Sequence, residues 1–178
     1  MNNIKNNTAF ARLTDEELSA PGFDPIGLIG SDWMLVTAGT EQAFNTMTAS
    51  WGFMGVMWNK PCAITAIRPQ RYTKEFIDKA EYFTASFFPE ENKSALAFCG
   101  SRSGRDVDKA KETGLTPVFG EGATAFAQAE MVFLCKKVYA APLSGDAIVD
   151  KAVDSANYSA GDYHTQYIGE ITAVYVKE

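Results

Sequence analysis

Six short segments rich in β-branched and aromatic residues limit this chain to a mainly β fold. Turn signals separate the segments: Gly39-Thr40 can close a hairpin between the first two, and Asn59-Lys60-Pro61 begins the third. The segments do not alternate with helices as they would in a βαβ chain. The pattern therefore predicts a six-stranded antiparallel β-barrel with helical insertions. The expected strands span residues 33–38, 44–50, 62–67, 82–87, 131–140 and 167–176.

Helices are expected at three places between these strands. Thr14 and Glu17 form a capping box for a further short helix, which Pro21-Gly22 ends. At 178 residues and 46% hydrophobic, the chain can bury the core of one ordinary domain. We therefore expect a single domain over residues 1–178, with residues 1–24 as an N-terminal arm. The three expected helices cover residues 73–80, 90–98 and 106–113, the last stopped by Gly114.

The acidic balance of the chain restricts its partners. The formal net charge is −6, and the Lys and Arg residues are interleaved with acids, whereas a nucleic-acid site needs an extended basic surface. No apolar run approaches the roughly 20 residues that span a bilayer. The Asn-rich start also lacks the apolar core of a signal peptide. The sequence predicts a cytoplasmic protein with neither a nucleic-acid nor a membrane partner.

The three cysteines and the single histidine argue against a metal site. Cys62, Cys99 and Cys135 are widely spaced and flanked by apolar or small residues, which is typical of buried thiols rather than of a disulfide framework or a zinc knuckle. Cys99 precedes a polar loop and can line a site without acting as a nucleophile. Since His164 is the only histidine, a histidine-rich metal centre is excluded. No metal is expected.

Two neighbouring runs carry the chemistry. Residues 45–52 place hydroxyl and amide side chains among small residues, so that a planar polar ligand can approach the backbone closely. After one apolar strand, Arg68, Arg71 and Lys74 put three positive charges into seven residues of an acidic protein. Such a local cluster suits a phosphate group. The pair of runs predicts a site for a phosphorylated cofactor, and Trp51 can cover a ring system or a subunit contact.

Two further sequence features concern other kinds of site, a dinucleotide site and a hydrolase. The segment 120–125 matches G-x-G-x-x-A, but Pro117 interrupts the strand that a dinucleotide fingerprint needs, so a flexible surface loop is expected there. His164 has no Gly-x-Ser-x-Gly elbow to make a hydrolase with it. A lone histidine at the start of a terminal strand is more often held for packing than catalytic, and both roles stay open at this point.

Taken in order, several stretches resemble the flavin reductase-like FMN-binding split-barrel family, in particular its flavoredoxin branch. They are residues 45–52, 59–61, 68–73, 101–104 with 108–109, and 164–171. The resemblance implies a six-stranded Greek-key split barrel, a homodimer, and FMN in a groove near the dimer interface. It matches most of the chain, although residues 116–128 and 144–161 carry no matching motif and are further places for substrate-side residues.

The resemblance also implies roles for particular residues. The flavin ring is expected against Thr46, Thr48, Ala49, Ser50 and Trp51. The ribityl-phosphate end is expected near Arg68, Arg71, Tyr72 and Thr73, closed by Ser101, Ser103 and Lys109. Asn45, Met47 and Cys99 complete the expected cofactor-binding set, and His164 is the candidate catalytic residue on the open face of the ring.

The expected activity is that of an oxidoreductase that passes electrons through FMN. The donor is either NAD(P)H or a reduced redox protein, and no nucleotide motif decides between them. A flavoredoxin-type electron carrier that does not use NAD(P)H is one alternative. A non-catalytic module that binds flavin is another. In each case the flavin carries the redox chemistry, while the protein supplies position and electrostatics.

Overall fold

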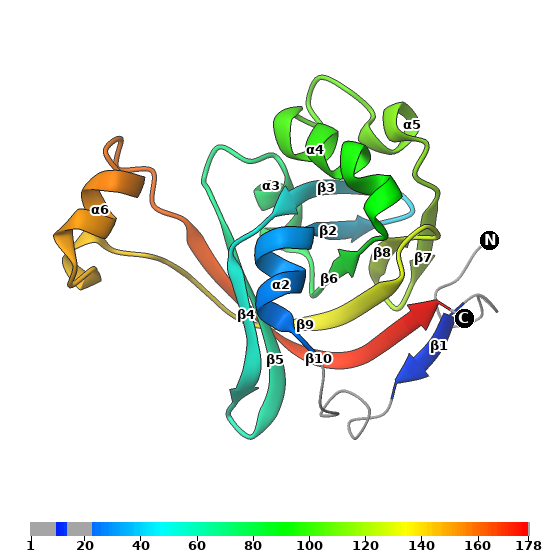
Figure 1. Cartoon of the computed structure of the whole chain (residues 1–178), viewed down its shortest axis with the longest axis horizontal. Helices are drawn as coiled ribbons and strands as arrows, with labels where there is room; N and C mark the ends of the chain where they lie inside the picture. The colour runs from blue at the N-terminus through cyan, green and yellow to red at the C-terminus, as the bar shows by residue number, and fades with distance from the viewer. Residues whose placement is uncertain (1–9, 14–22, 178) are drawn as a thin grey trace.

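A large antiparallel sheet organises the molecule, which is described here from a computed structural model covering residues 10–13 and 23–177. Within these residues the strand order is β3-β2-β6-β9-β10-β5-β4, and β1 pairs with the far end of β10. Figure 1 shows the long, bent β10 running across the sheet. The strands are β1 (Phe10–Leu13), β2 (Met34–Thr40), β3 (Ala43–Ala49), β4 (Gly52–Met57), β5 (Lys60–Ile67), β6 (Tyr82–Phe87), β9 (Met131–Pro142) and β10 (Thr165–Lys177).

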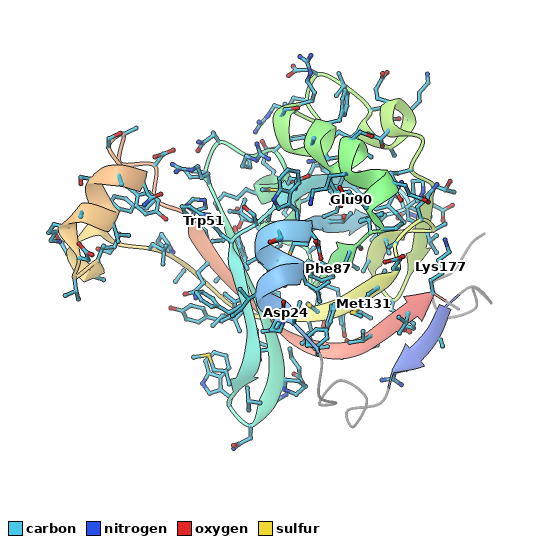
Figure 2. All side chains as sticks on the ribbon, viewed as in Figure 1. Asp24, Trp51, Phe87, Glu90, Met131 and Lys177 are labelled. Carbon is cyan, nitrogen blue, oxygen red and sulfur yellow. The ribbon has the colours of Figure 1, made fainter. Side chains whose placement is uncertain are left out.

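The two edges of this sheet are consecutive in the chain. β3 and β4 lie at opposite ends of the strand order, yet only Ser50 and Trp51 separate them. The sheet is therefore curved so that its first and last strands approach without pairing, which leaves an open seam. The hydroxyl-rich run identified in the sequence ends at this seam. Trp51 is placed between the body of the sheet and the outer segment that follows β9 (Figure 2).

The prediction of a mainly β antiparallel fold is confirmed, but the number of six strands is wrong. The six expected segments correspond to β2, β3, β5, β6, β9 and β10, and the bounds of β6 match the expectation. Among the described residues the sheet has eight strands, because β1 and β4 join it. β4 was missed because its glycines, Gly52 and Gly55, weaken the strand signal. It forms because a two-residue turn at Trp58-Asn59 folds it back onto β5.

A second correction concerns residues 117–126. These form a separate two-stranded hairpin of β7 (Pro117–Gly120) and β8 (Ala123–Phe126), not a flexible surface loop. The turn has left-handed backbone at Glu121 (φ 54°) and Gly122 (φ 74°). Phe126 is fully buried. Pro117 is tolerated because it is the first residue of its strand.

The helices lie outside the sheet and agree in part with the expectation. The short helix expected around Thr14 lies outside the described residues. Within them, α5 begins after residue 106 because Asp108 caps it, and Gly114 ends it with left-handed backbone (φ 70°). The helices are α2 (Pro25–Gly27), η2 (Leu28–Asp32), α3 (Thr73–Lys79), η3 (Glu90–Asn92), α4 (Lys93–Ser101), α5 (Lys109–Thr113), η4 (Gly145–Ala147) and α6 (Lys151–Asn157).

Two apolar cores stabilise this arrangement and fix the position of the seam. One core includes Leu35, Phe126 and Leu134, beneath α4 and the β7–β8 hairpin. The other includes Ile67 and Phe133 and fills the space around which the sheet curves. The segment between β9 and β10 carries η4 and α6 and projects from the sheet at the left of Figure 1. No helix among the described residues is long and apolar enough to cross a membrane.

Candidate functional site

A cavity of about 310 Å³ lies at the seam of the sheet. We call it cavity A. Three segments that are distant in the sequence form it. They are the end of β3 with Ser50 and Trp51, the end of β5 with the loop that follows it, and His164, which precedes β10. Its volume is at the lower end of the range usual for small-molecule pockets. The lining residues are Met47, Thr48, Ala49, Ser50, Trp51, Ala66, Arg68, Gln70, Arg71 and His164.

A second, smaller cavity of about 150 Å³ adjoins the first. We call it cavity B. Met47, Gln70 and Arg71 line both cavities, so together they form one elongated site with Arg71 at its middle. Cavity B lies where the N-terminus of α3 meets the loop after α4 and the first residue of α5. Its lining residues are Met47, Gln70, Arg71, Tyr72, Thr73, Ser101, Arg102, Ser103 and Lys109.

Three expected cofactor residues lie outside both cavities. Asn45 is buried and donates from Nδ2 to Oγ1 of Thr73 over 2.8 Å, which ties β3 to the start of α3. The hydroxyl of Thr46 is 2.8 Å from that of Thr37 on the neighbouring strand. Cys99 is fully buried, and burial raises the pKa of its thiol to about 11. These three side chains therefore contribute to packing and hydrogen bonding between the surrounding elements, and not to the lining of cavities A and B.

The cationic run divides into paired and unpaired charges. Arg68 forms an ion pair with Asp162, and Lys74 pairs with Asp78 over 2.8 Å, one helical turn away. Arg71 has no carboxylate partner among the described residues and donates instead to the carbonyl oxygen of Gly100 over 2.8 Å. Burial lowers the pKa of Arg71, but a guanidinium remains charged. The available positive charge of the run is therefore concentrated at Arg71, between the two cavities.

Lys109 adds a buried positive group to cavity B. Its side chain is buried, and Nζ donates to the carbonyl oxygens of Thr46 over 2.8 Å and of Cys99 over 2.7 Å. Burial is the main cause that lowers the pKa of Lys109 to about 8, and the nearby charge of Arg71 lowers it further. An anion bound beside these two groups would offset both effects. The geometry thus favours an anionic ligand group in cavity B.

His164 lies at the opposite end of the site from Lys109. Its ring centroid is 4.8 Å from that of Trp51, with 36° between the planes. Nδ1 is 2.9 Å from the hydroxyl oxygen of Tyr158. Burial, and after it the charge of Arg68, lowers the pKa of His164, while Asp162 acts in the opposite direction. The imidazole is therefore held mainly neutral near pH 7.

Sequence reasoning missed several residues of the site. Gln70 and Arg102 stood inside recognised runs but were not selected. Ala66 faces cavity A from the end of β5, where its small size leaves room for a ligand. Tyr158 and Asp162 come from the segment before β10, which carries no motif, and only the three-dimensional contacts reveal their place. The described residues contain no group of three or more His, Cys, Asp and Glu side chains suited to a metal ion.

Comparison with known proteins fits this site. The model of the flavin reductase-like domain matches residues 26–178. The chain belongs to the flavin reductase-like domain family. The family match includes the seam, both cavities and the segment that carries Tyr158. No curated protein matches the chain.

Solved structures of flavin reductase-like proteins share the fold. Flavoredoxin from Methanosarcina acetivorans is 22% identical with a TM-score of 0.65, over 83% of this chain and 69% of that one. An FMN-binding protein from Thermus thermophilus with bound p-hydroxybenzaldehyde is 25% identical with a TM-score of 0.65, over 89% and 80% of the two chains. The NADH:FAD oxidoreductase SgcE6 from Streptomyces globisporus is 19% identical with a TM-score of 0.59, over 80% and 74%.

Proposed function

We propose that this chain binds FMN in the adjoining cavities A and B and passes electrons through it. One observation carries the proposal: cavity B is lined by the half-buried Arg71 and the buried Lys109, neither of which has a carboxylate partner among the described residues. Hydroxyl groups surround them, and arginine forks with hydroxyl donors suit a phosphate. Cavity A continues from this end into a space bordered by small side chains and Trp51. The donor set and the shape both fit a flavin mononucleotide.

The residues divide into two groups in this proposal. Arg71 and Lys109 bind the phosphate, with the hydroxyls of Ser101, Ser103 and Tyr72 as further donors. The ring lies along the end of β3, where the exposed Ser50 and the backbone of its neighbours offer donors. Arg68, which is tied to Asp162, lies beside the ring end rather than the phosphate end. In this proposal Asn45, Thr46 and Cys99 do not contact the ligand and instead hold the surrounding elements together.

The chemistry follows from what the chain positions. Bound flavin supplies hydride and single-electron transfer. The protein holds a planar ligand between β3 and the loop after β5, and it keeps positive charge at one end of the site. His164 is the candidate for contact with the reacting partner on the open side of the ring, because it lines cavity A. No strong acid or base is needed for this role.

The source of the electrons defines two candidate functions. In the first, NADH or NADPH reduces the flavin directly, as in a flavin reductase. In the second, the protein is a flavoredoxin-type carrier that receives electrons from a redox protein. The G-x-G sequence of residues 120–122 forms the turn of a hairpin rather than the strand-to-helix junction of a dinucleotide site, so it favours neither candidate.

Anaerobic reduction separates these candidates. The purified protein, loaded with FMN, is mixed in turn with NADH, NADPH and reduced ferredoxin, and bleaching of the flavin absorbance is followed. Fast bleaching by a nicotinamide supports the reductase, and bleaching by ferredoxin alone supports the carrier. A protein that binds FMN but exchanges electrons with none of the three would be a non-catalytic flavin module. Retention of FMN through gel filtration distinguishes a bound cofactor from a diffusible substrate.

We also propose that the protein acts as a homodimer. The β4–β5 hairpin projects from the sheet (Figure 1) and exposes apolar side chains, with Phe53 68% and Val56 80% exposed. Met54, on the same strand, packs against the second core and is only partly exposed. The hairpin begins next to Trp51, so a second copy seated on it would border cavity A. A cytoplasmic location remains a prediction.

A further inference from the structure

His164 is fixed from two sides by aromatic rings. Trp51 lies at a centroid distance of 4.8 Å, and Tyr158 is edge-on at 5.6 Å with 81° between the planes. His164 as a whole residue is 8% exposed. Its Nδ1 is 2.9 Å from the hydroxyl of Tyr158. One ring nitrogen, Nδ1, is therefore bonded to a protein partner. Whether the other nitrogen, Nε2, carries a proton determines whether the ring can donate or accept a hydrogen bond in cavity A.

Tyr158 is itself held in place by the segment that follows α6. Its ring stacks on that of Tyr163 at 4.7 Å with 28° between the planes. The guanidinium carbon of Arg68 lies 5.4 Å from the centre of the Tyr158 ring. Arg68 is in turn fixed by its ion pair with Asp162 and by a 2.9 Å hydrogen bond to the carbonyl oxygen of Asn157. The hydroxyl of Tyr158 thus has little freedom to turn elsewhere.

The direction of the hydrogen bond follows from counting donors and acceptors. Tyr158 is 6% exposed, and Nδ1 of His164 is the only hydrogen-bond partner of its hydroxyl among the described residues. If Nδ1 carried the proton, the phenol hydrogen would have no acceptor among the described residues, which is costly at a site with so little exposure. A phenol that donates to an sp² nitrogen avoids this cost. A neutral imidazole that accepts at Nδ1 must carry its own proton at Nε2.

The remaining nitrogen is not enclosed by the protein. Nε2 has no hydrogen-bond partner among the described residues. The buried side-chain polar atoms without a partner, within the same residues, are the hydroxyls of Thr65 and Ser86, so Nε2 is not sealed inside the protein. His164 lines cavity A. A proton at Nε2 would therefore be available to a bound molecule.

We propose that Tyr158 is a positioning residue that fixes His164 as the Nε2–H tautomer, which presents a hydrogen-bond donor to an acceptor oxygen of a planar ligand in cavity A. The charged groups around the pair are Arg68 and Asp162, which form an ion pair, and Asp154, which accepts a hydrogen bond from the hydroxyl of Tyr163. The tautomer is a property of the protein alone. The assignment of the acceptor oxygen to the flavin or to its redox partner rests on the proposed function. The segment before β10, which has no motif, thereby acquires a role in the site.

The single histidine makes the tautomer directly measurable. Protein labelled with ¹⁵N and prepared without a histidine tag gives one imidazole pattern in a long-range ¹H–¹⁵N correlation spectrum. At pH 7.5 we expect the pattern of the Nε2–H tautomer, and Tyr158→Phe should convert it to an averaged pattern of both tautomers. Tyr163→Phe is the matched control, because it removes a 2.9 Å hydrogen bond to Asp154 but keeps the ring stack. That control should leave the pattern unchanged.

Two results would overturn the proposal. One is an Nδ1–H pattern in the wild-type protein, which needs no variant and decides the direction of the bond even where Tyr158→Phe fails to fold. The other is a wild-type pattern that persists in folded Tyr158→Phe. Neither depends on electron transfer. If the tautomer behaves as proposed but no reductant bleaches bound FMN, the role of Tyr158 stands and the proposed function falls.

Discussion

At the scale of single residues, the positive groups of cavity B determine which ligand the site accepts. We predict that Arg71→Ala weakens FMN binding more than riboflavin binding, by roughly 1.5–3 kcal/mol, because a charge-assisted hydrogen bond to the phosphate is lost. Titration calorimetry with both ligands measures the difference. Lys74→Ala is the matched control, since Lys74 is already paired with Asp78. Equal weakening of both ligands by Arg71→Ala would show that Arg71 does not contact the phosphate.

The lowered pKa of Lys109 predicts how the stability of the protein depends on pH. Its pKa is lowered from the ordinary 10.5 to about 8, so between these values the unfolded chain binds more protons at this group than the folded protein. The free energy of unfolding should therefore rise with pH across that window relative to Lys109→Met, by at most about 1.4 kcal/mol per pH unit. Urea unfolding of both proteins without flavin, at pH 7.5 and 9.5, measures the difference. An equal change in the free energy of unfolding between the two pH values in both proteins would contradict a lowered pKa of Lys109.

At the scale of elements, the short capped helix α5 holds Lys109 in position. Lys109 is the first residue of α5, and the carboxylate of Asp108 caps this helix by accepting from the backbone N–H of Lys111 over 3.1 Å. We predict that Asp108→Ala lowers the free energy of unfolding by about 0.5–2 kcal/mol and weakens FMN binding, because the first turn of α5 frays. Asp108→Asn should retain most of the stability and most of the FMN affinity. Glu112→Ala, on the same helix, should leave the stability and the FMN affinity unchanged. Urea unfolding and FMN titration test this, and equal effects of Ala and Asn at position 108 would contradict it.

The helices and strands also show how much of the fold can be predicted from the sequence. The bounds of β6, which has strong β propensity, were predicted to the residue, the other five expected strands were displaced by one to two residues at one or both ends, and Gly114 was correctly predicted to end a helix. β4 was missed because pairing with β5, rather than local propensity, makes it a strand. The β7–β8 hairpin was mistaken for a loop because Pro117 suggested an interruption. Local patterns predict elements that are stable by their own composition, whereas elements made by tertiary pairing need the structure.

The same limit applies to the site. Residues 47–51 and Arg71 were selected because hydroxyl and cationic side chains stand out in the sequence, and the structure brings them together. Sequence cannot show that Asp162 neutralises Arg68, because 94 residues separate them. Nor can it show that Tyr158 contacts His164, since neither belongs to a motif that links them. Ion pairing and the tautomer of a histidine both depend on contacts between residues that are distant in the sequence, and only the structure shows these contacts.

At the scale of the whole molecule, the open seam places an unpaired sheet edge beside an apolar hairpin. β4 has no partner on its outer side among the described strands. Its turn has left-handed backbone at the bulky Trp58 (φ 53°), which is 53% exposed. Such conformations cost free energy and persist where they serve a purpose. An exposed edge with apolar side chains invites association, and a second copy of the chain would cover it.

We therefore predict a homodimer whose formation strengthens flavin binding. Val56→Lys, at the exposed hairpin, should shift the sedimentation equilibrium at micromolar concentration from dimer to monomer, because a lysine at an edge strand opposes pairing. FMN should also bind more weakly, since Trp51 at the base of the hairpin borders cavity A. Val149→Lys is the matched control: Val149 is 95% exposed but lies in the segment beside α6, away from β4. A wild-type protein that is monomeric with FMN fully bound would refute the dimer, whereas a monomeric Val56→Lys that binds FMN with wild-type affinity would show that each chain completes its own site.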